Sequence, residues 1–256
     1  MNKYTIPVEA MSALDALKSA LTDLRGAYLY GSATLGGLHV DSDVDVLAIS
    51  GAPLTGSERS MLTERLLTVS GKLGAGGARP LEVTVMSAAE ALSPGYPPLR
   101  DYQYGEWLRA GIEHGSIPQP ERDPDAAILL WQVRISGVTL LGAPPCDTIA
   151  PTPESAIRRA IGGALPDLMG YLKGDERNVL LTLARMLYTL RERGICAKDT
   201  AAEWSKAFLA PDDAALMELA RQEYLGRARH DWRALYPDAA RAAQAMHALI
   251  LSELTR

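Results

Sequence analysis

The chain has 256 residues, 47% of them hydrophobic, and can therefore bury the core of one large domain or of two modest ones. Its formal net charge of −5 provides no basic surface for nucleic acid, whereas it suits cationic ligands. The two cysteines, Cys146 and Cys196, lie far apart in the sequence and lack the spacing of a disulfide framework or a zinc site. The sequence shows neither an apolar leader nor a run of about 18 apolar residues, so we expect a soluble cytoplasmic protein.

Helical and extended patterns alternate over the first ninety residues. Leucines recur at helical spacing between residues 14 and 24, which predicts an amphipathic helix. The apolar and aromatic segment 27–30 is typical of a short strand that ends at Gly31-Ser32, and two further glycines then extend a flexible loop. The alternation of valines with other residues over 40–49 predicts a second strand.

The next elements are predicted from their boundary signals. Residues 55–58 have the spacing of a capping box and open a helix. After a glycine-rich turn at 74–77, alternation over 80–86 predicts a third strand. Asp123 followed by Pro124 predicts the start of another helix, with the aspartate as N-cap and the proline at the first helical position.

A proline-rich segment at residues 143–153 is the best domain boundary in the sequence. Beyond it we find helical patterns and no convincing strand. The predicted helical stretches are 179–190, which is ended by Gly194, then 199–209, 212–225 and 238–254. We therefore predict an α+β protein, with a sheet-containing domain at residues 1–150 and an all-helical domain at 151–256.

Asp43 and Asp45 stand two positions apart on the predicted second strand. Their carboxylates should project from one face while Val44 and Val46 enter the core. Adjacent carboxylates repel each other, and proteins tolerate such pairs mainly where a cation lies between them. Hard oxygen ligands at this spacing suit Mg²⁺, which also binds phosphate oxygens.

Three further residues extend this pattern. Gly31 lets the backbone approach a ligand closely, and Ser32 offers a hydroxyl and an N–H to a phosphate oxygen. Glu82 lies on the predicted third strand and could bind metal or accept the proton of an attacking hydroxyl. An isolated Asp-x-Asp or Gly-Ser is usually a surface strand or a turn, whereas the combination favours a functional site.

This combination resembles the signature of the nucleotidyltransferase superfamily, which includes DNA polymerase β and many antibiotic-modifying enzymes. Segments in both halves of the chain are similar to the aminoglycoside (3″)(9) adenylyltransferases, which modify streptomycin and spectinomycin. In chain order these segments are Leu29-Tyr30-Gly31-Ser32, Gly36-Gly37-Leu38, Asp41-Ser42-Asp43-Val44-Asp45, Arg79-Pro80-Leu81-Glu82-Val83-Thr84, Gln103-Tyr104-Gly105-Glu106-Trp107, Ala127-Ile128-Leu129-Leu130, Gly174-Asp175-Glu176-Arg177-Asn178-Val179, Leu181-Thr182-Leu183, Arg185, Lys198-Asp199, Ala201-Ala202, Trp204 and Tyr224-Leu225-Gly226.

The resemblance implies a polymerase β-like mixed-sheet domain followed by a helical bundle that completes the ATP and drug site. It implies two magnesium ions held by Asp43 and Asp45, with Glu82 as general base, as metal ligand or as both. Gly31 and Ser32 would lie at the triphosphate of ATP.

The resemblance also assigns residues of the second half. Arg185 and Lys198 would pair with ATP phosphates, and Tyr224 would help to hold the nucleotide. Trp107, from the first half, and Asp175 match residues that contact the drug, as a platform for a guanidinium and a partner for an ammonium. Taken alone, Trp107 could be a core aromatic, Asp175 a helix cap, and the two cations solvated helix charges.

One segment departs from the relatives that accept streptomycin. Where they carry an acidic residue followed by tryptophan, this chain has Tyr171-Leu172. The loss of an anion would weaken the grip on a guanidino group, although Asp167 could compensate. Spectinomycin is therefore the firmer expectation.

The predicted activity is transfer of AMP from ATP to a drug hydroxyl, the 9-OH of spectinomycin or the 3″-OH of streptomycin, with release of pyrophosphate and resistance to the antibiotic. We expect a monomer without nucleic-acid or membrane partners. Two alternatives remain: adenylylation of a protein or an RNA end by the same fold, and a nucleotide-binding regulator without catalysis. The three carboxylates argue against the second, because simple binding needs no third carboxylate placed as a base.

Overall fold

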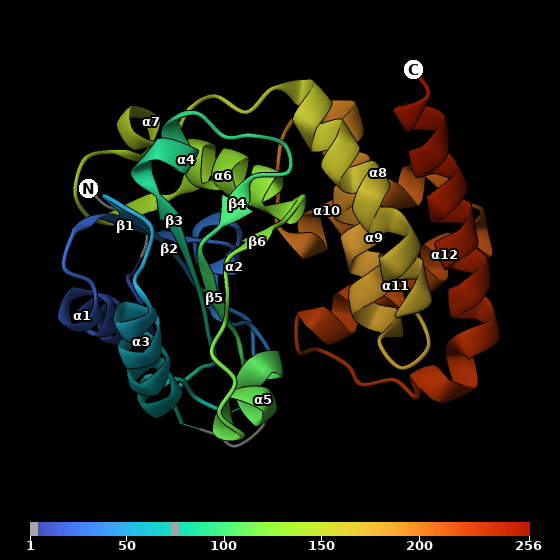
Figure 1. Ribbon diagram of the computed structural model, residues 1–256. Helices are drawn as coiled ribbons and strands as arrows, with labels where there is room; N and C mark the ends of the chain where they lie inside the picture. Colours follow the sequence, from blue (N-terminus) through green and yellow to red (C-terminus); the bar gives the residue numbers. More distant parts are fainter. Residues whose placement is uncertain (1–4, 73–76) are drawn as a thin grey trace. The chain divides into compact units, whose positions relative to one another are not determined.

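The computed structural model describes residues 5–72 and 77–256, and the chain divides into two compact units, residues 1–156 and 157–256 (Figure 1). The predicted turn at 74–77 lies, except for Gly77, outside the described residues, as does the start of the chain. Among the described residues, no helix has the length and hydropathy needed to cross a lipid bilayer.

The first unit is built on a mixed five-stranded sheet. Its strand order is β5-β3-β2-β1-β7, in which β2 and β3 run parallel while the other neighbours are antiparallel. The strands are β1 (Leu24–Tyr30), β2 (Val44–Ser50), β3 (Leu81–Ser87), β5 (Tyr102–Tyr104) and β7 (Val138–Leu141). The predicted mixed-sheet domain is thus confirmed.

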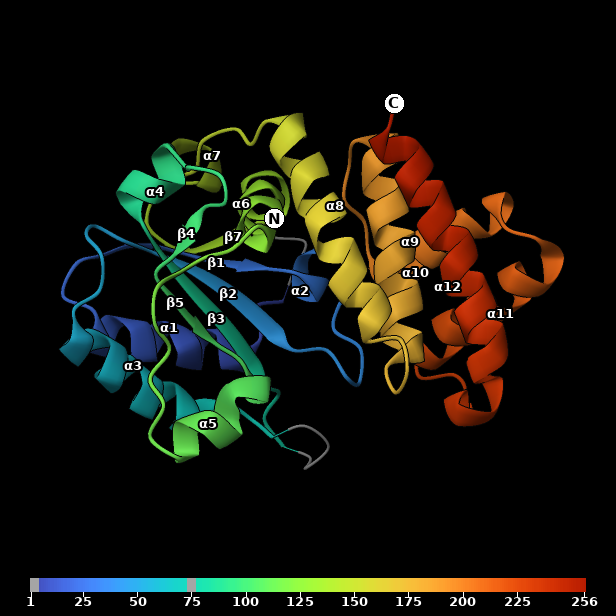
Figure 2. The ribbon, with the colours of Figure 1, turned by 45° about the vertical axis from the view of Figure 1, so that its right-hand side comes forward.

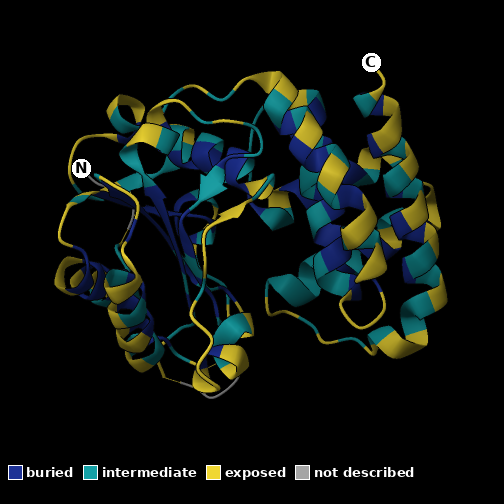
Figure 3. Cartoon of the chain, viewed as in Figure 1, coloured by how far each residue is buried: buried dark blue, intermediate teal, exposed yellow. Residues whose placement is uncertain are grey.

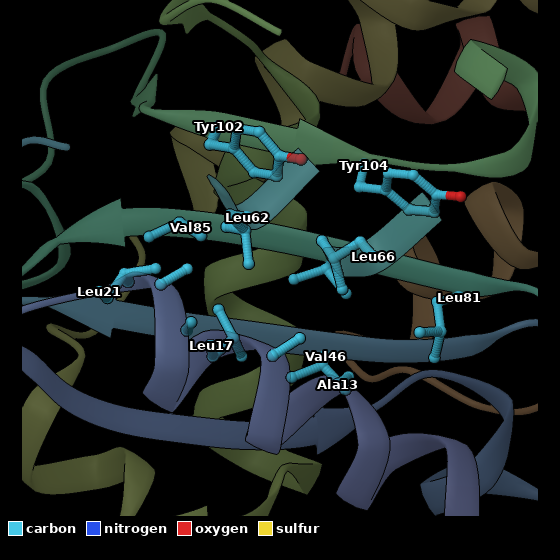
Figure 4. Packing of buried hydrophobic residues seen from close by; sticks show 14 of the residues in the cluster. Ala13, Leu17, Leu21, Val46, Leu62, Leu66, Leu81, Val85, Tyr102 and Tyr104 are labelled. Carbon is cyan, nitrogen blue, oxygen red and sulfur yellow. The ribbon is translucent and has the colours of Figure 1, made fainter. Parts of the chain in front are cut away.

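Helices cover both faces of this sheet (Figures 1 and 2). α1 (Val8–Ala20) and α3 (Gly56–Val69) pack on one face, where their leucines meet the strand valines, as Figure 4 shows for Leu17 and Leu62. α6 (Asp125–Ser136) packs on the other face together with short α4 (Ala88–Leu92) and α7 (Pro145–Thr148). The remaining elements of this unit are α2 (Ser32–Leu35), β4 (Leu99–Arg100), η1 (Glu106–Leu108), α5 (Arg109–Glu113) and β6 (Glu121–Arg122).

The second unit is all-helical, as predicted. Its elements are α8 (Glu154–Gly170), which begins just before the division between the units, α9 (Glu176–Glu192), α10 (Lys198–Ser205), η2 (Lys206–Phe208), α11 (Pro211–Tyr224) and α12 (Trp232–Leu254). α9 is central and contacts α10, α11 and α12. Buried residues line the inward faces of these helices and fill the strands of the sheet in the first unit (Figure 3).

Several boundaries differ from the sequence prediction. β2 begins at Val44 rather than at residue 40, because His39 and Ser42 close a turn in which Ser42 N donates to His39 O at 3.1 Å. Arg79 fixes the two carbonyl oxygens of this turn, through Nη1 at 2.5 Å from His39 O and 3.2 Å from Ser42 O. The strands β5 and β7 were not predicted, since three and four residues are too few for a periodic pattern.

The edge strand β5 is fixed by a buried ion pair. Arg59 of α3 places Nη2 at 2.5 Å from Asp101 Oδ1, and Asp101 Oδ2 accepts the N–H of Leu54. One residue on, the Tyr102 hydroxyl lies 3.0 Å from Thr63 Oγ1. Both partners of the ion pair are almost fully buried, so removal of either would leave an unpaired charge in the interior.

The predicted capping box of α3 is present and reaches further than the helix itself. Thr55 Oγ1 accepts the N–H of Glu58, and Glu58 Oε2 accepts the N–H of Thr55 at 2.9 Å. Glu58 Oε1 also accepts both the N–H and the hydroxyl of Thr22, at 2.9 and 2.7 Å, just before β1. These hydrogen bonds lower the pKa of Glu58 to about 2, and the largest effect comes from the Thr22 N–H.

Replacement of Glu58 by Gln should therefore lower the free energy of unfolding at pH 7 by about 1 kcal/mol, the usual cost of a lost cap. The folded pKa lies below the unfolded value of about 4.3, so the contribution is complete above pH 5 and disappears as the pH falls towards 2. Urea unfolding at pH 7, 5 and 3 measures this difference. Glu64→Gln, on the exposed side of α3, is the control. If the difference in unfolding free energy between wild type and Glu58→Gln is as large at pH 3 as at pH 7, the lowered pKa of Glu58 is contradicted.

Candidate active site

Three side chains form a row across β1, β2 and β3. Tyr30 pairs with Asp45 in the antiparallel register of β1 and β2, and Asp45 pairs with Glu82 in the parallel register of β2 and β3. Residues directly opposite each other project from the same face of a sheet. All three therefore project from the face that α6 covers, at the end of the sheet where β1 finishes and β2 and β3 begin.

Burial alternates at this end of the sheet. Val44, Val46, Leu81 and Val83 are at most 1% exposed and belong to the core under α1 and α3. Asp43, Asp45 and Glu82 are only partly buried. Asp43 precedes the first residue of β2 instead of lying inside the strand as predicted, yet its burial continues the alternation and it stands two residues from Asp45.

Gly31 brings the backbone against Asp45. Its φ of 68° and ψ of −143° suit glycine alone, and a Cβ built on it would overlap Asp45 Oδ2 and lie 2.6 Å from Asp45 Cγ. Ser32 follows as the first residue of α2, where the sequence indicated a flexible loop. Ser32 therefore opens a helical turn directly after the glycine whose backbone lies against the Asp45 carboxylate.

The Tyr30 hydroxyl shares the environment of the two strand carboxylates. Burial raises the pKa of Tyr30 well above its ordinary value, and the negative charges of Glu82 and Asp45 raise it further. The phenol therefore stays neutral at physiological pH beside the acidic groups. Sequence reasoning missed Tyr30, because its place beside Glu82 follows from the pairing of three strands.

Glu82 is approached from the edge strand as well. Gln103, the middle residue of β5, donates through Nε2 to Glu82 Oε1 at 3.4 Å. β5 pairs antiparallel with β3 and sets Gln103 opposite Thr84, two positions from Glu82 on the same face. A neutral amide that donates to a carboxylate favours its charged form and restrains its orientation.

The acidic residues do not by themselves form a complete metal cage. Within residues 5–72 and 77–256, no group of three or more His, Cys, Asp or Glu side chains is arranged to hold a metal ion. Mg²⁺ is usually held by one or two carboxylates, with substrate phosphates and water completing its shell. Asp43 and Asp45, beside the Gly31-Ser32 turn, are a donor set of this kind.

Trp107 lies on η1, directly after β5. Its side chain is 56% exposed, which excludes the alternative that it is a core residue. In the described part of the first unit no other aromatic side chain is as exposed, and a planar cation could lie against its face.

The predicted nucleotide residues of the second unit come from three helices. Arg185 lies within α9, Lys198 is the first residue of α10, and Tyr224 is the last residue of α11; all three are partly buried. Burial raises the pKa of the Cys196 thiol to about 11, although the positive charge of nearby Arg185 opposes this shift. Cys196 is therefore a protonated, unreactive thiol beside Arg185 at neutral pH.

Asp175 occupies the N-cap position of α9 without capping it. Its side chain accepts no hydrogen bond from the first turn of the helix backbone and instead accepts one from Asn178 Nδ2 at 2.6 Å. Asp175 is exposed. The alternative that this carboxylate serves only as a helix cap is therefore not supported by the geometry.

Glu223 was missed by sequence analysis and connects the segments that carry Asp175 and Tyr224. Glu223 Oε2 accepts the Trp232 indole N–H at 2.9 Å and the His230 backbone N–H at 3.0 Å. Glu223 Oε1 lies 3.5 Å from Arg177 Nη1, two residues from Asp175. A single glutamate on a helix carries no pattern from which this role could be read.

Comparison with known proteins shows which family the chain resembles. The domain family described as "Aminoglycoside adenylyltransferase, C-terminal domain" matches residues 147–248. A spectinomycin 9-adenylyltransferase of Staphylococcus aureus is 44% identical over 233 residues, which cover 90% of each chain. An aminoglycoside (3'') (9) adenylyltransferase of Klebsiella pneumoniae is 36% identical over 211 residues, covering 80% of this chain and 79% of the relative.

A solved structure is similar over nearly the whole chain. It is the crystal structure of a spectinomycin adenyltransferase from Enterococcus faecialis with ATP and spectinomycin, which has a TM-score of 0.89 and 28% identity and covers 95% of this chain and 98% of that one. A mixed sheet with paired aspartates beside a Gly-Ser turn defines the nucleotidyltransferase class. Within that class, the chain belongs to the aminoglycoside adenylyltransferase family.

The contact between Gly31 and Asp45 can be tested with two alanine variants. Gly31→Ala and Gly37→Ala both place alanine at a positive φ, of 68° and 98°, and each should lose roughly 1–2 kcal/mol of stability. A Cβ at Gly37 meets nothing within 4 Å, whereas one at Gly31 must displace Asp45. Titration calorimetry with ATP and Mg²⁺ should show affinity reduced on the order of tenfold or more for Gly31→Ala alone. Equal affinities of the two variants contradict a ligand role for Asp45.

Proposed function

We propose that this protein transfers AMP from ATP to a hydroxyl of spectinomycin or a related aminocyclitol antibiotic, releases pyrophosphate and so confers resistance. The observation that carries the proposal is the alignment of Asp45 with Glu82 beside the Gly31 turn. Support comes from the relatives, which are named for this activity, and from the similar structure with ATP and spectinomycin. The need for ATP is consistent with a place in the cytoplasm.

Asp43 and Asp45 would hold Mg²⁺, and phosphate oxygens and water, rather than a third carboxylate, would complete its shell. The fit rests on two partly buried carboxylates two residues apart, of which Asp45 lies against the backbone of the Gly31 turn. Mg²⁺ bound there, as one ion or two, would neutralise charge on the triphosphate. The chain's own part is to fix the two carboxylates and to leave room for phosphate oxygens at Gly31 and Ser32.

Glu82 would act as the general base. It would accept the proton of the drug hydroxyl, whose oxygen then forms a bond to the α-phosphorus of ATP while the bond to pyrophosphate breaks. Gln103 Nε2 would keep the carboxylate orientated during this transfer. The neutral Tyr30 phenol would exclude water from the buried side of the row.

The second unit would supply cations for the leaving group. Arg185 and Lys198 would pair with phosphate oxygens of ATP, and Tyr224 would hold the nucleotide. We assign nucleotide transfer to residues 1–150 and completion of the ATP and drug sites to residues 151–256. The enzyme would act as a monomer, independently of nucleic acid and of membranes.

The acceptor would be recognised as a cation. Trp107 offers an exposed indole face and Asp175 an exposed carboxylate, and the net charge of −5 favours positive ligands over anionic ones. Tyr171 is 70% exposed and stands where relatives that accept streptomycin would carry an anion. Spectinomycin is therefore the preferred substrate in this proposal.

Glu82→Gln tests the base directly. The amide cannot accept the proton, so turnover should fall by a factor on the order of 10² or more, while calorimetric ATP binding changes little. Asp41→Asn, an exposed neighbour in the same acidic segment, should keep normal turnover. Pyrophosphate release with spectinomycin measures both variants, and near-normal turnover of Glu82→Gln removes it from the base role.

Substrate choice is tested by mass spectrometry of each drug after incubation with ATP and Mg²⁺. Spectinomycin should gain one AMP, and streptomycin should react less. Tyr171→Asp should raise kcat/KM for streptomycin by up to about fivefold, since an ion pair at this exposed position contributes on the order of 1 kcal/mol or less. Tyr171→Asn is the matched control, because asparagine has the size of aspartate but no charge. A protein or nucleic-acid product without any AMP-drug adduct would exclude the proposed acceptor.

A further inference from the structure

The indole of Trp107 lies against the backbone of Gly105. A Cβ built on Gly105 would overlap Cη2 and Cζ3 of the ring and lie 2.6 Å from Cε3. The backbone of Gly105 is ordinary extended chain, with φ −161°, so its conformation does not require glycine. Glycine is needed here for space, because the ring occupies the volume that a side chain would fill.

Glu106, between these two residues, connects η1 to the surrounding elements through its buried carboxylate. Its side chain is 6% exposed and accepts four hydrogen bonds. The donors are Ser70 Oγ at 2.6 Å, Tyr104 OH at 2.8 Å, and Arg109 Nε and Nη2 at 2.6 and 2.9 Å. Although burial opposes the shift, the hydrogen bonds from Arg109, Ser70 and Tyr104 lower the pKa of Glu106, which is therefore anionic at neutral pH.

The same network reaches the strand of Glu82. Ser70 Oγ donates to Glu106 and accepts the backbone N–H of Leu81 at 3.0 Å, one residue before Glu82. Arg109 additionally donates through Nη2 to Ser70 O at 3.2 Å. A chain of partly buried hydrogen bonds thus connects η1, which carries Trp107, to the start of β3.

We propose that Gly105 and Glu106 are positioning residues that hold the Trp107 indole in one exposed orientation as the platform for the cationic acceptor. Gly105 provides the space that the ring fills, and Glu106 ties η1 to Ser70 at the end of α3, to β5 and to α5. This inference rests on the proposed function, because it assigns the acceptor to Trp107.

A fixed ring has a clear advantage over a mobile one. An exposed tryptophan that samples several rotamers must be ordered when the ligand binds, and this ordering weakens binding. A ring held against Gly105 is ordered before the ligand arrives. The orientation should therefore affect acceptor binding and leave ATP binding unchanged.

The first arm of the test compares two glycines of the same region. Gly105→Ala must displace the ring, whereas a Cβ at Gly111 of α5 makes ordinary contacts at 3.7 and 3.8 Å with Ser116. Gly105→Ala should raise KM for spectinomycin by about tenfold or more, in the range of a lost cation–π contact, and leave KM for ATP within about twofold. Gly111→Ala should match wild type in both.

A double-mutant cycle then asks whether Gly105 acts through the ring. Trp107→Ala alone should raise KM for spectinomycin, and adding Gly105→Ala to it should cause little further change. Additive effects of the two substitutions would overturn the proposal, because Gly105 would then act independently of the indole.

The second arm tests Glu106 with Glu106→Gln, which keeps the shape and loses the charge. Glu113→Gln is the control, since Glu113 also lies near Arg109, at 3.6 Å, but is 47% exposed. Labelling with 5-fluorotryptophan gives a readout besides activity, with the ¹⁹F resonance of Trp107 assigned by its loss in Trp107→Phe. Gly105→Ala and Glu106→Gln should move this resonance and leave those of Trp131, Trp204 and Trp232 in place.

The outcomes separate the two proposals. An unmoved Trp107 resonance in Gly105→Ala, or a moved resonance with unchanged KM for spectinomycin, overturns the positioning role while the proposed function stands. Absence of spectinomycin-dependent pyrophosphate release in the wild type overturns the proposed function and, with it, the acceptor platform. A selective rise in KM for spectinomycin together with a moved Trp107 resonance supports the inference.

Discussion

The site depends on the parallel register of β2 and β3, which sets Asp45 opposite Glu82. A slip of one residue in β3 would turn Glu82 into the core under α1 and α3 and bring Leu81 or Val83 to the acidic row. The buried residues of the opposite face prevent such a slip, because Val46 and Val83 are completely enclosed there. The hydrophobic core therefore determines the distance between the two carboxylates, although none of its members carries out any chemistry.

The parts of this arrangement that follow a local period could be predicted from the sequence. Alternation by two placed Asp45 and Glu82 on strand faces opposite their core neighbours, and the capping signal of Thr55 located the start of α3. The roles of Tyr30 and Gln103 could not be predicted, because they arise where strands distant in sequence pair. A short strand such as β5 carries no period of its own and is defined only by its partner.

The sequence also could not predict where a neighbouring side chain fills the space beside a glycine. Gly31 and Gly105 look alike in the sequence as turn or loop residues, but Gly31 combines a positive φ with a neighbouring carboxylate, whereas Gly105 has ordinary backbone angles beneath an aromatic ring. In the helical unit, Glu223 connects segments that are far apart along the chain. In each case the role depends on a neighbour brought in by the fold, and only coordinates reveal it.

The two cysteines differ in reactivity, and this difference provides a chemical handle. Burial keeps the Cys196 thiol protonated, with a pKa of about 11, whereas Cys146 is exposed on α7, outside the residues assigned to the site. Maleimide reagents react with the thiolate, so at neutral pH they will modify Cys146 and spare Cys196. A fluorophore can therefore be attached to the natural sequence at a single position on α7, which gives a spectroscopic label without engineering the chain.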